Sequence, residues 1–168
     1  MDSPASPSWV PVYVGIGSNL DDPQAQVRAA FDELAGLAGS RLILRSGLYR
    51  SAPLGPPGQP HYVNAAAGLL TQRSPEQMLA ALKELESRMG RARPVVRWGP
   101  RRIDFDLLVY GDARIESAQL TVPHPGVPQR NFVLYPLLDI APDLHVPGHG
   151  SVRRLAAAVG SAGLERLE

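Results

Sequence analysis

The chain has 168 residues, a length typical of one domain that buries roughly two-thirds of the surface its unfolded chain exposes. A formal net charge of +1 does not indicate a nucleic-acid partner, and the lack of cysteine excludes disulfides, iron–sulfur clusters and thiolate zinc sites. MDSPASPSWV is unlike a signal peptide, and no apolar run approaches the ~18 residues of a membrane span. We therefore expect a cytoplasmic protein that contacts no membrane, with 1–8 as a disordered tail and 9–168 as a single domain. We also expect a monomer, although nothing in the composition sets the oligomeric state.

The first part of the chain predicts a strand, a helix and two further strands. Asp22 caps the helix and Pro23 takes its first position, while apolar residues recur at helical spacing from Val27 to Ala38. The strands are expected at 10–16, which ends in a glycine turn at 15–19, at 41–50 and at 62–71, with a Pro/Gly-rich loop at 52–60.

A second helix and a strand complete the pattern. Ser74-Pro75-Glu76-Gln77 forms a capping box that opens a helix through Met89, with Gly90 as its stop. An apolar strand over 103–109 follows an arginine-rich segment. This order predicts the α+β class, specifically a ferredoxin-like βαββαβ sandwich with an antiparallel sheet and both helices packed on one face. Extra C-terminal elements are expected beyond it: a short strand pair, a helix around 131–138 and a last helix around 152–159.

The segment from Arg88 to Tyr110 contains six arginines and no acid before two aspartates on the predicted strand. Asp104 and Asp106 point to the same side, with Cα atoms roughly 6–7 Å apart, and repel each other unless a cation lies near them. The pattern suits a polyphosphate carried on magnesium. The alternative is a solvated strand face beside a solvated loop, although Trp98 within that loop favours a lid.

Three further positions allow a functional or a structural interpretation. Tyr62 and Asn64 share a strand face and could recognise a flat heterocycle, or could be a core tyrosine and an edge asparagine. Gly15-x-Gly17 lacks the third glycine of a dinucleotide fingerprint and is typical of a close backbone approach that could form a ligand wall. His124 lies between two prolines, where it could present its ring to a phosphate.

Several segments resemble the 6-hydroxymethyl-7,8-dihydropterin pyrophosphokinase family of folate biosynthesis. The resemblance runs in order from about residue 12 to residue 147. The matching pieces are GIGSNL (15–20), YRSAPLGPPGQPHYVNAA (49–66), GRAR (90–93), RWGPRRIDFDLL (97–108) and LTVPHP…RNFVLYPLLDIAPDL (120–144).

The resemblance implies an ATP- and magnesium-dependent enzyme that transfers diphosphate from ATP to 6-hydroxymethyl-7,8-dihydropterin and releases AMP. It implies that Asp104 and Asp106 hold two magnesium ions and that the arginine segment closes over the site. The implied catalytic residues are Arg91, Arg101, Asp104 and Asp106. The implied ATP contacts are Glu86, Arg93, Trp98, Arg101, Leu107, Thr121, His124 and Arg130. The implied pterin contacts are Gly17, Ser51, Ala52, Leu54, Tyr62, Asn64 and Phe132.

The chain departs from the family pattern at three positions that flank ATP. Lys83 stands where one member of the family has glutamine, Gln119 where that member has arginine, and Pro125 where it has an aromatic residue. Two other classes share the predicted element order. An RNA-recognition module would carry exposed aromatics on the strand that here carries aspartates. A nucleotidyl cyclase or polymerase palm would leave Tyr62 and Asn64 unexplained.

Overall fold

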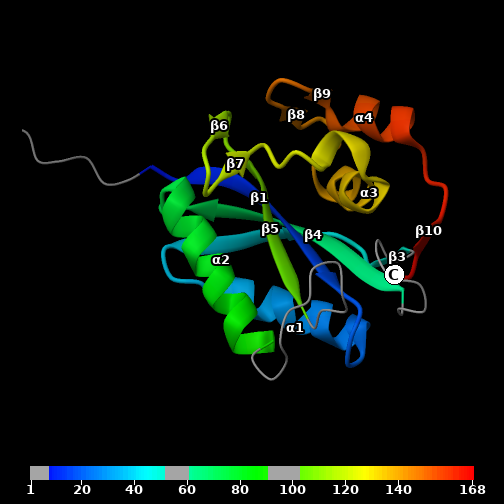
Figure 1. Cartoon of the computed structure of the whole chain (residues 1–168), viewed down its shortest axis with the longest axis horizontal. Helices are drawn as coiled ribbons and strands as arrows, with labels where there is room; N and C mark the ends of the chain where they lie inside the picture. Colours follow the sequence, from blue (N-terminus) through cyan, green and yellow to red (C-terminus); the bar gives the residue numbers. More distant parts are fainter. Residues whose placement is uncertain (1–7, 52–60, 91–102) are drawn as a thin grey trace, which may run out of the picture.

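The computed structural model describes residues 8–51, 61–90 and 103–168, which build one antiparallel sheet with helices on both faces. The sheet has six strands in the order β10-β3-β4-β1-β5, with β2 also paired to β4 (Figure 1). The strands are β1 (Val10–Ser18), β2 (Ser40–Arg45), β3 (Tyr49–Ser51), β4 (Tyr62–Thr71), β5 (Asp104–Tyr110) and β10 (Leu164–Arg166). The antiparallel α+β prediction is confirmed.

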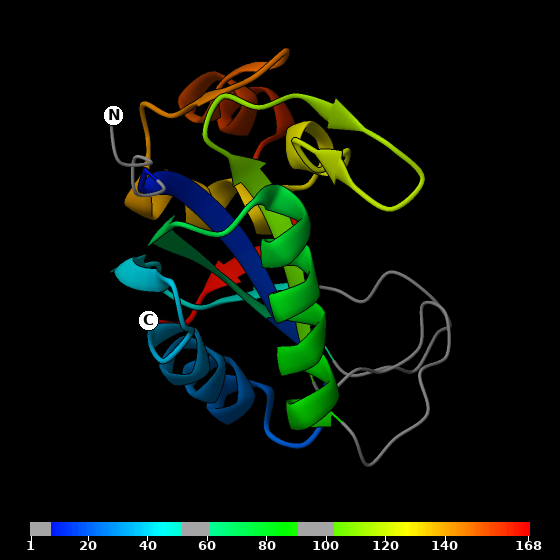
Figure 2. The same ribbon diagram turned by 90° about the vertical axis from the view of Figure 1, so that its left-hand side faces the viewer.

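Helices cover both faces of this sheet (Figure 2). On one face, α1 (Pro23–Ala35) and α2 (Pro75–Gly90) bury an apolar cluster that includes Phe31, Leu34 and Leu82. On the other, α3 (Asn131–Ile140) packs against β4 and α4 (Val152–Val159) packs on α3, around a second cluster that includes Leu134 and Leu137. The first pair lies on one face as the βαββαβ pattern predicts, and the second pair adds a third layer.

Local capping signals begin both helices of the first layer where the sequence predicts. The Ser74 hydroxyl accepts from the Gln77 amide at 3.2 Å, and the Gln77 side chain accepts from the Ser74 amide at 2.8 Å, which completes the capping box. The Asp22 carboxylate accepts from the Ala25 amide at 3.4 Å. The predicted extension of α1 to Ala38 is wrong, since the helix ends at Ala35 and Gly39 adopts a positive φ of 71°.

The predicted strand over 41–50 is two strands. The Ser46 amide donates to the Ala66 carbonyl at 2.9 Å, and the Ser46 hydroxyl accepts from the Ala66 amide at 2.8 Å, so a side chain replaces a backbone acceptor in the ladder. A register shift between Leu42 and Leu44 also bends β2. This break lets β2 and β3 both pair with β4.

The predicted glycine turn at 15–19 is also wrong, because β1 continues through Ser18. Gly15 pairs with Asp106 of β5 on one side, and Gly17 pairs with Asp104 of β5 and with Asn64 of β4. Strand pairing on both sides satisfies the backbone here. At these two positions the middle of the sheet therefore has no side chains on the face that α3 covers.

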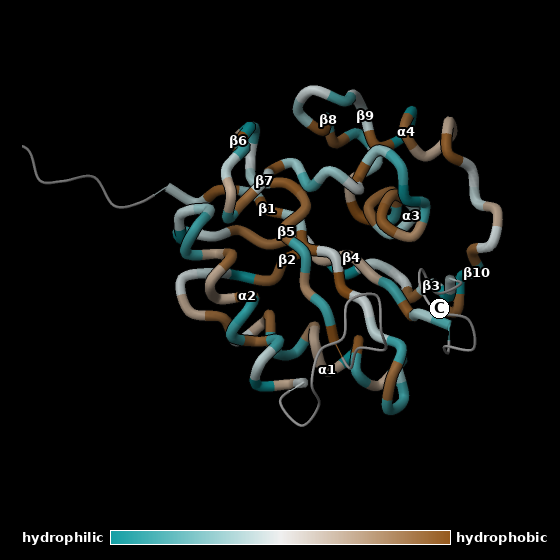
Figure 3. Tube along the Cα trace, in the orientation of Figure 1, coloured by the Kyte–Doolittle hydropathy of each residue, from teal (hydrophilic) through white to brown (hydrophobic). Residues whose placement is uncertain are grey.

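The C-terminal part contains the expected strand pair, β6 (Ile115–Glu116) and β7 (Thr121–Val122), and both expected helices. A 3₁₀ turn, η1 (Val127–Gln129), precedes α3. The hairpin β8 (His145–Val146) and β9 (Gly150–Ser151) and the strand β10 were not anticipated. Figure 3 shows apolar residues along most of α3, which packs against both β4 and α4. In the part of the chain that the structure describes, no helix is long and apolar enough to cross a bilayer.

Candidate active site

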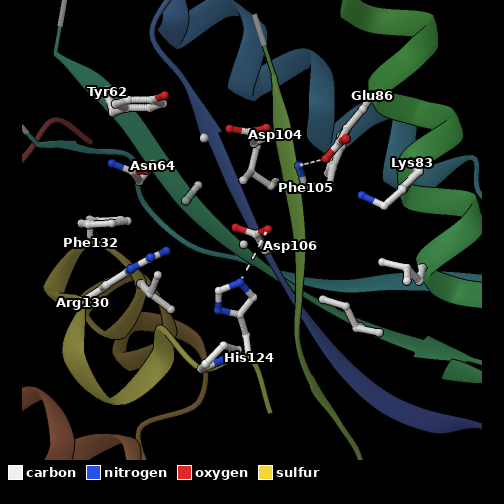
Figure 4. Close-up of a pocket in the computed structure, with 18 of the residues that line it drawn as sticks. Tyr62, Asn64, Lys83, Glu86, Asp104, Phe105, Asp106, His124, Arg130 and Phe132 are labelled. Atoms are coloured by element: carbon white, nitrogen blue, oxygen red, sulfur yellow. Dashed lines mark hydrogen bonds and ion pairs between the residues drawn. The ribbon is translucent and has the colours of Figure 1, made fainter. Parts of the chain in front are cut away.

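A cavity of about 510 Å³ lies over the glycine positions of β1, on the face of the sheet that carries α3. Its floor comes from β1, β4 and β5, and its walls come from α2, the start of α3 and the segment around His124 (Figure 4). A β-carbon built on Gly17 would lie 3.2 Å from the Asn64 Oδ1, and one built on Gly15 would lie 3.3 Å from Leu108. Side chains at these positions would fill the space that a ligand needs.

Two carboxylates project into the cavity from β5. Asp104 and Asp106 lie on one face of the strand while Phe105 and Leu107 are buried on the other, as the alternation predicts. The Asp106 side chain is 50% exposed. Among the described residues, no group of three or more acidic, histidine or cysteine side chains could hold a metal. Two hard oxygen donors nevertheless fit Mg²⁺, which usually keeps waters and shares its coordination with substrate phosphates.

His124 faces these carboxylates from the segment after β7. Its Nδ1 accepts from the Gly126 amide at 3.0 Å, so the neutral ring carries its proton on Nε2, which lies 3.9 Å from the Asp106 Oδ1. Burial lowers the pKa of His124, the charge of Asp106 opposes this shift, and Arg130 adds to it. The ring is therefore a neutral hydrogen-bond donor at neutral pH.

Arg130 supplies the positive charge on this side of the cavity. Its guanidinium carbon lies 5.8 Å from the centre of the Phe132 ring, in a cation–π arrangement. A β-carbon on Gly126 would lie 2.8 Å from the Arg130 Nε, so only glycine leaves room for this conformation. The guanidinium points toward the carboxylates in Figure 4.

An aromatic slot forms the other end of the cavity. The rings of Tyr62 on β4 and Phe132 on α3 lie on either side of Asn64 in Figure 4. Asn64 is only 5% exposed, and its Nδ2 donates to the Ser51 hydroxyl at 2.7 Å. This bond fixes the plane of the amide between the two rings. A flat ligand with a donor–acceptor edge fits such a slot.

The opposite end of the cavity lies along the open edge of β5. The Glu86 Oε1, from α2, accepts from the Phe105 amide at 2.8 Å and so satisfies a backbone donor at the sheet edge. Lys83, one turn earlier on α2, points toward the same edge (Figure 4). A ligand in this region would meet the backbone edge of β5, the apolar side chain of Leu79 and the positive charge of Lys83.

The cavity brings together every predicted site residue that the structure describes. These are Gly17, Ser51, Tyr62, Asn64, Glu86, Asp104, Asp106, Leu107, Thr121, His124, Arg130 and Phe132. The predicted residues Ala52, Leu54, Arg91, Arg93, Trp98 and Arg101, and the predicted lid, lie outside the described residues. The prediction named Gly15 only as a possible ligand wall, and it omitted the lining residues Ile16, Ala65, Leu79, Phe105, Leu120 and Val133. The omitted residues are apolar and carry no local signal that separates them from the core, whereas Gly15 lies in the glycine motif and pairs with Asp106 in the sheet.

The comparison with protein families decides the assignment. The model of the family described as 7,8-dihydro-6-hydroxymethylpterin-pyrophosphokinase (HPPK) matches residues 13–142. The chain belongs to the HPPK family. This range contains every residue of the cavity described above.

Curated relatives agree with the HPPK assignment. The chain is 46% identical over 156 residues to the 2-amino-4-hydroxy-6-hydroxymethyldihydropteridine pyrophosphokinase of Pseudomonas aeruginosa, covering 93% of this chain and 96% of that one. It is 40% identical over 146 residues to the enzyme of the same name from Haemophilus influenzae, covering 87% and 91%. As an HPPK, the chain is a pyrophosphokinase of folate biosynthesis.

Solved structures support the HPPK fold. The wild-type HPPK-DHPS of Plasmodium falciparum with pterin and p-hydroxybenzoate superposes with a TM-score of 0.72 at 14% identity. The match covers 95% of this chain and 46% of that one, so the chain spans about half the length of this two-part protein.

Proposed function

We propose that the chain transfers the terminal diphosphate of ATP to the hydroxymethyl group of 6-hydroxymethyl-7,8-dihydropterin. The hydroxymethyl oxygen loses its proton to solvent and bonds to the β-phosphorus of ATP, the bond from that phosphorus to the α,β-bridging oxygen breaks, and AMP leaves. One observation carries the proposal. The carboxylate pair of β5 and the aromatic slot around Asn64 open into the same cavity, so an anionic donor and a flat acceptor can meet there.

Two Mg²⁺ ions bound by Asp104 and Asp106 would neutralise the triphosphate and help to orient it. The residues themselves supply the rigid part of this arrangement, because both carboxylates are fixed on one strand of the sheet. His124 and Arg130 face the same space as hydrogen-bond donors and would contact phosphate oxygens. The arginines at 91, 93 and 101, with Trp98, would close over ATP.

The aromatic slot would hold the pterin. Tyr62 and Phe132 would stack on its two faces, and Asn64 would recognise its pyrimidine edge, with Gly17 and Ser51 against the ring. Ala52 and Leu54 would complete this pocket. On the far side, Glu86, Leu107 and Thr121 would contact ATP along the edge of β5. We further propose that the protein works as a cytoplasmic monomer with no nucleic-acid partner.

The deciding experiment follows AMP in a mixture of protein, ATP, Mg²⁺ and 6-hydroxymethyl-7,8-dihydropterin. The matched control replaces the acceptor with 6-methyl-7,8-dihydropterin, which keeps the ring and lacks the hydroxyl. AMP should form only with the hydroxymethyl compound and in equal amount to the diphosphorylated pterin. Formation of ADP, or turnover that does not depend on the pterin, would overturn the proposal.

A further inference from the structure

A hydrogen-bond network outside the cavity joins α3 to the β3–β10 edge of the sheet. Its centre is the carboxylate of Asp139, whose side chain is 22% exposed. Asp139 Oδ1 accepts from the Tyr49 hydroxyl at 2.7 Å, and Oδ2 accepts from the Gly47 amide at 3.0 Å and from the Arg166 guanidinium at 3.3 Å. Bonds to an ionised carboxylate are stronger than neutral ones, so one side chain ties three segments together.

Tyr49 extends this network to the back of the aromatic slot. It is 6% exposed and pairs directly with Asn64 in the β3–β4 ladder, so both side chains lie on the face that α3 covers. Ser51, the partner of the Asn64 amide, lies two residues further on the same face. Burial, the Asp139 hydrogen bond and the Asp139 charge together raise the pKa of Tyr49 to about 12, despite the opposing effect of Arg166, so the hydroxyl stays protonated.

The other end of the network lies on the helix that carries Phe132. Asp139 follows Phe132 by seven residues, about two turns of α3, so the two residues lie on one side of the helix. A bond at Asp139 therefore sets how α3 sits over β3 and β4. The position of α3 in turn determines the gap between Phe132 and the strand that carries Tyr62 and Asn64.

We propose that Asp139 and Tyr49 are positioning residues that set the width and orientation of the acceptor slot. Neither is among the described residues that line the cavity, so they act on the acceptor through Phe132, Asn64 and Ser51. The inference rests on the proposed function, in which a pterin occupies that slot. Arg166 adds the C-terminal strand β10 to the same network, since it pairs with Tyr49 in the ladder.

Tyr49→Phe and Asp139→Asn test the proposal with little change in side-chain size: the first removes the hydroxyl donor, and the second removes the carboxylate charge and replaces one acceptor oxygen by a donor. For Tyr49→Phe we expect the KM for the pterin to rise about 3- to 10-fold, with kcat and the KM for ATP within about 2-fold of wild type. Asp139→Asn should change the same parameter. The effects of the two changes should be less than additive in the double variant, because both changes act on the Tyr49–Asp139 contact, while Asp139→Asn also weakens the bonds from Gly47 and Arg166. Tyr110→Phe is the matched control, since its hydroxyl bonds the Arg73 carbonyl at the far end of β5.

Direct binding separates this proposal from the proposed function. Calorimetry with the pterin, a non-hydrolysable ATP analogue and Mg²⁺ should show weaker pterin binding by both variants and wild-type binding by Tyr110→Phe. A lower melting temperature with unchanged pterin affinity would overturn the positioning role and indicate a purely structural bond. An equal rise in both KM values would also overturn it. Failure of the wild type to produce AMP would instead defeat the proposed function, while the binding comparison would still decide the positioning role.

Discussion

The two ends of the cavity are built in different ways. At the aromatic end, neutral groups are held by direct contacts: Asn64 bonds Ser51, and Tyr49 behind them bonds Asp139. At the carboxylate end, charged groups of both signs face a common space, with Asp106 half exposed and 3.9 Å from His124. The hydrogen bonds at the aromatic end form between residues of the protein itself. The charged groups at the carboxylate end suit cations and anions that arrive with a substrate.

This contrast predicts that substitutions at the two ends of the cavity should change different kinetic parameters. Changes at the aromatic end should affect the affinity for the acceptor, because its contacts exist before and during the reaction. Changes to the two carboxylates should affect turnover, because charge is redistributed beside them when the phosphorus–oxygen bond breaks, whereas changes along the edge of β5 should affect the KM for ATP. Substitutions at Asp106, Asn64 and Lys83 probe this division, and a fourth prediction concerns the stability of the Tyr49 contact.

The largest effect is expected for Asp106→Asn, which removes an anionic oxygen donor at the carboxylate end. We expect kcat to fall by about 100-fold or more, because metal binding is worth several kcal/mol in such reactions. Steady-state rates across a Mg²⁺ titration measure this. Asp112→Asn, in the exposed turn after β5, is the control. Near-wild-type turnover at low Mg²⁺ would show that Asp106 holds no metal.

At the aromatic end, Asn64→Leu should raise the KM for the pterin by about 10-fold or more, because it removes the amide that would read the ring edge. The KM for ATP should change little. Ser51→Ala is a matched, milder change, since it removes only the acceptor that orients the amide. Equal effects on ATP and pterin would break the proposed division of the cavity.

Lys83 tests the part of the cavity along the edge of β5, where its side chain points from α2. Lys83→Gln should raise the KM for ATP by about 2- to 5-fold, because an exposed charge contributes little in water, and Lys83→Arg should retain the wild-type value. The difference between the two variants should shrink at high salt. A KM for ATP that is the same in both variants would exclude a charge contact at this position.

The last expected effect concerns stability and not activity: a pH dependence of unfolding that comes from Tyr49. Its pKa is raised from 10.0 to about 12 in the folded protein, so its contribution to stability is complete below pH 10 and is lost as the pH rises toward 12. Urea unfolding between pH 9 and about pH 12 should therefore show a steeper loss of stability in the wild type than in Tyr49→Phe. Parallel curves for the two proteins would contradict this assignment.

Local signals predicted the helices well and the strands less well. The capping box at Ser74 and the cap at Asp22 act within one turn, so their hydrogen bonds are specified by neighbours in the sequence. The break between β2 and β3 depends on Ala66, which is 20 residues away from Ser46. The pairing of Gly15 and Gly17 depends on β4 and β5, so a segment that resembles a turn became a strand.

The amino-acid sequence by itself determined the carboxylate pair, the family and the chemistry that the family implies. Asp104 and Asp106 share a face because alternation is a property of any strand, and the motifs are contiguous in the chain. Only the tertiary structure decided how the acceptor slot is supported. Tyr49 and Asp139 are 90 residues apart, and no pattern in the sequence around either residue predicts their contact. Their contact forms only when α3 packs over the sheet, so it became visible in the folded molecule alone.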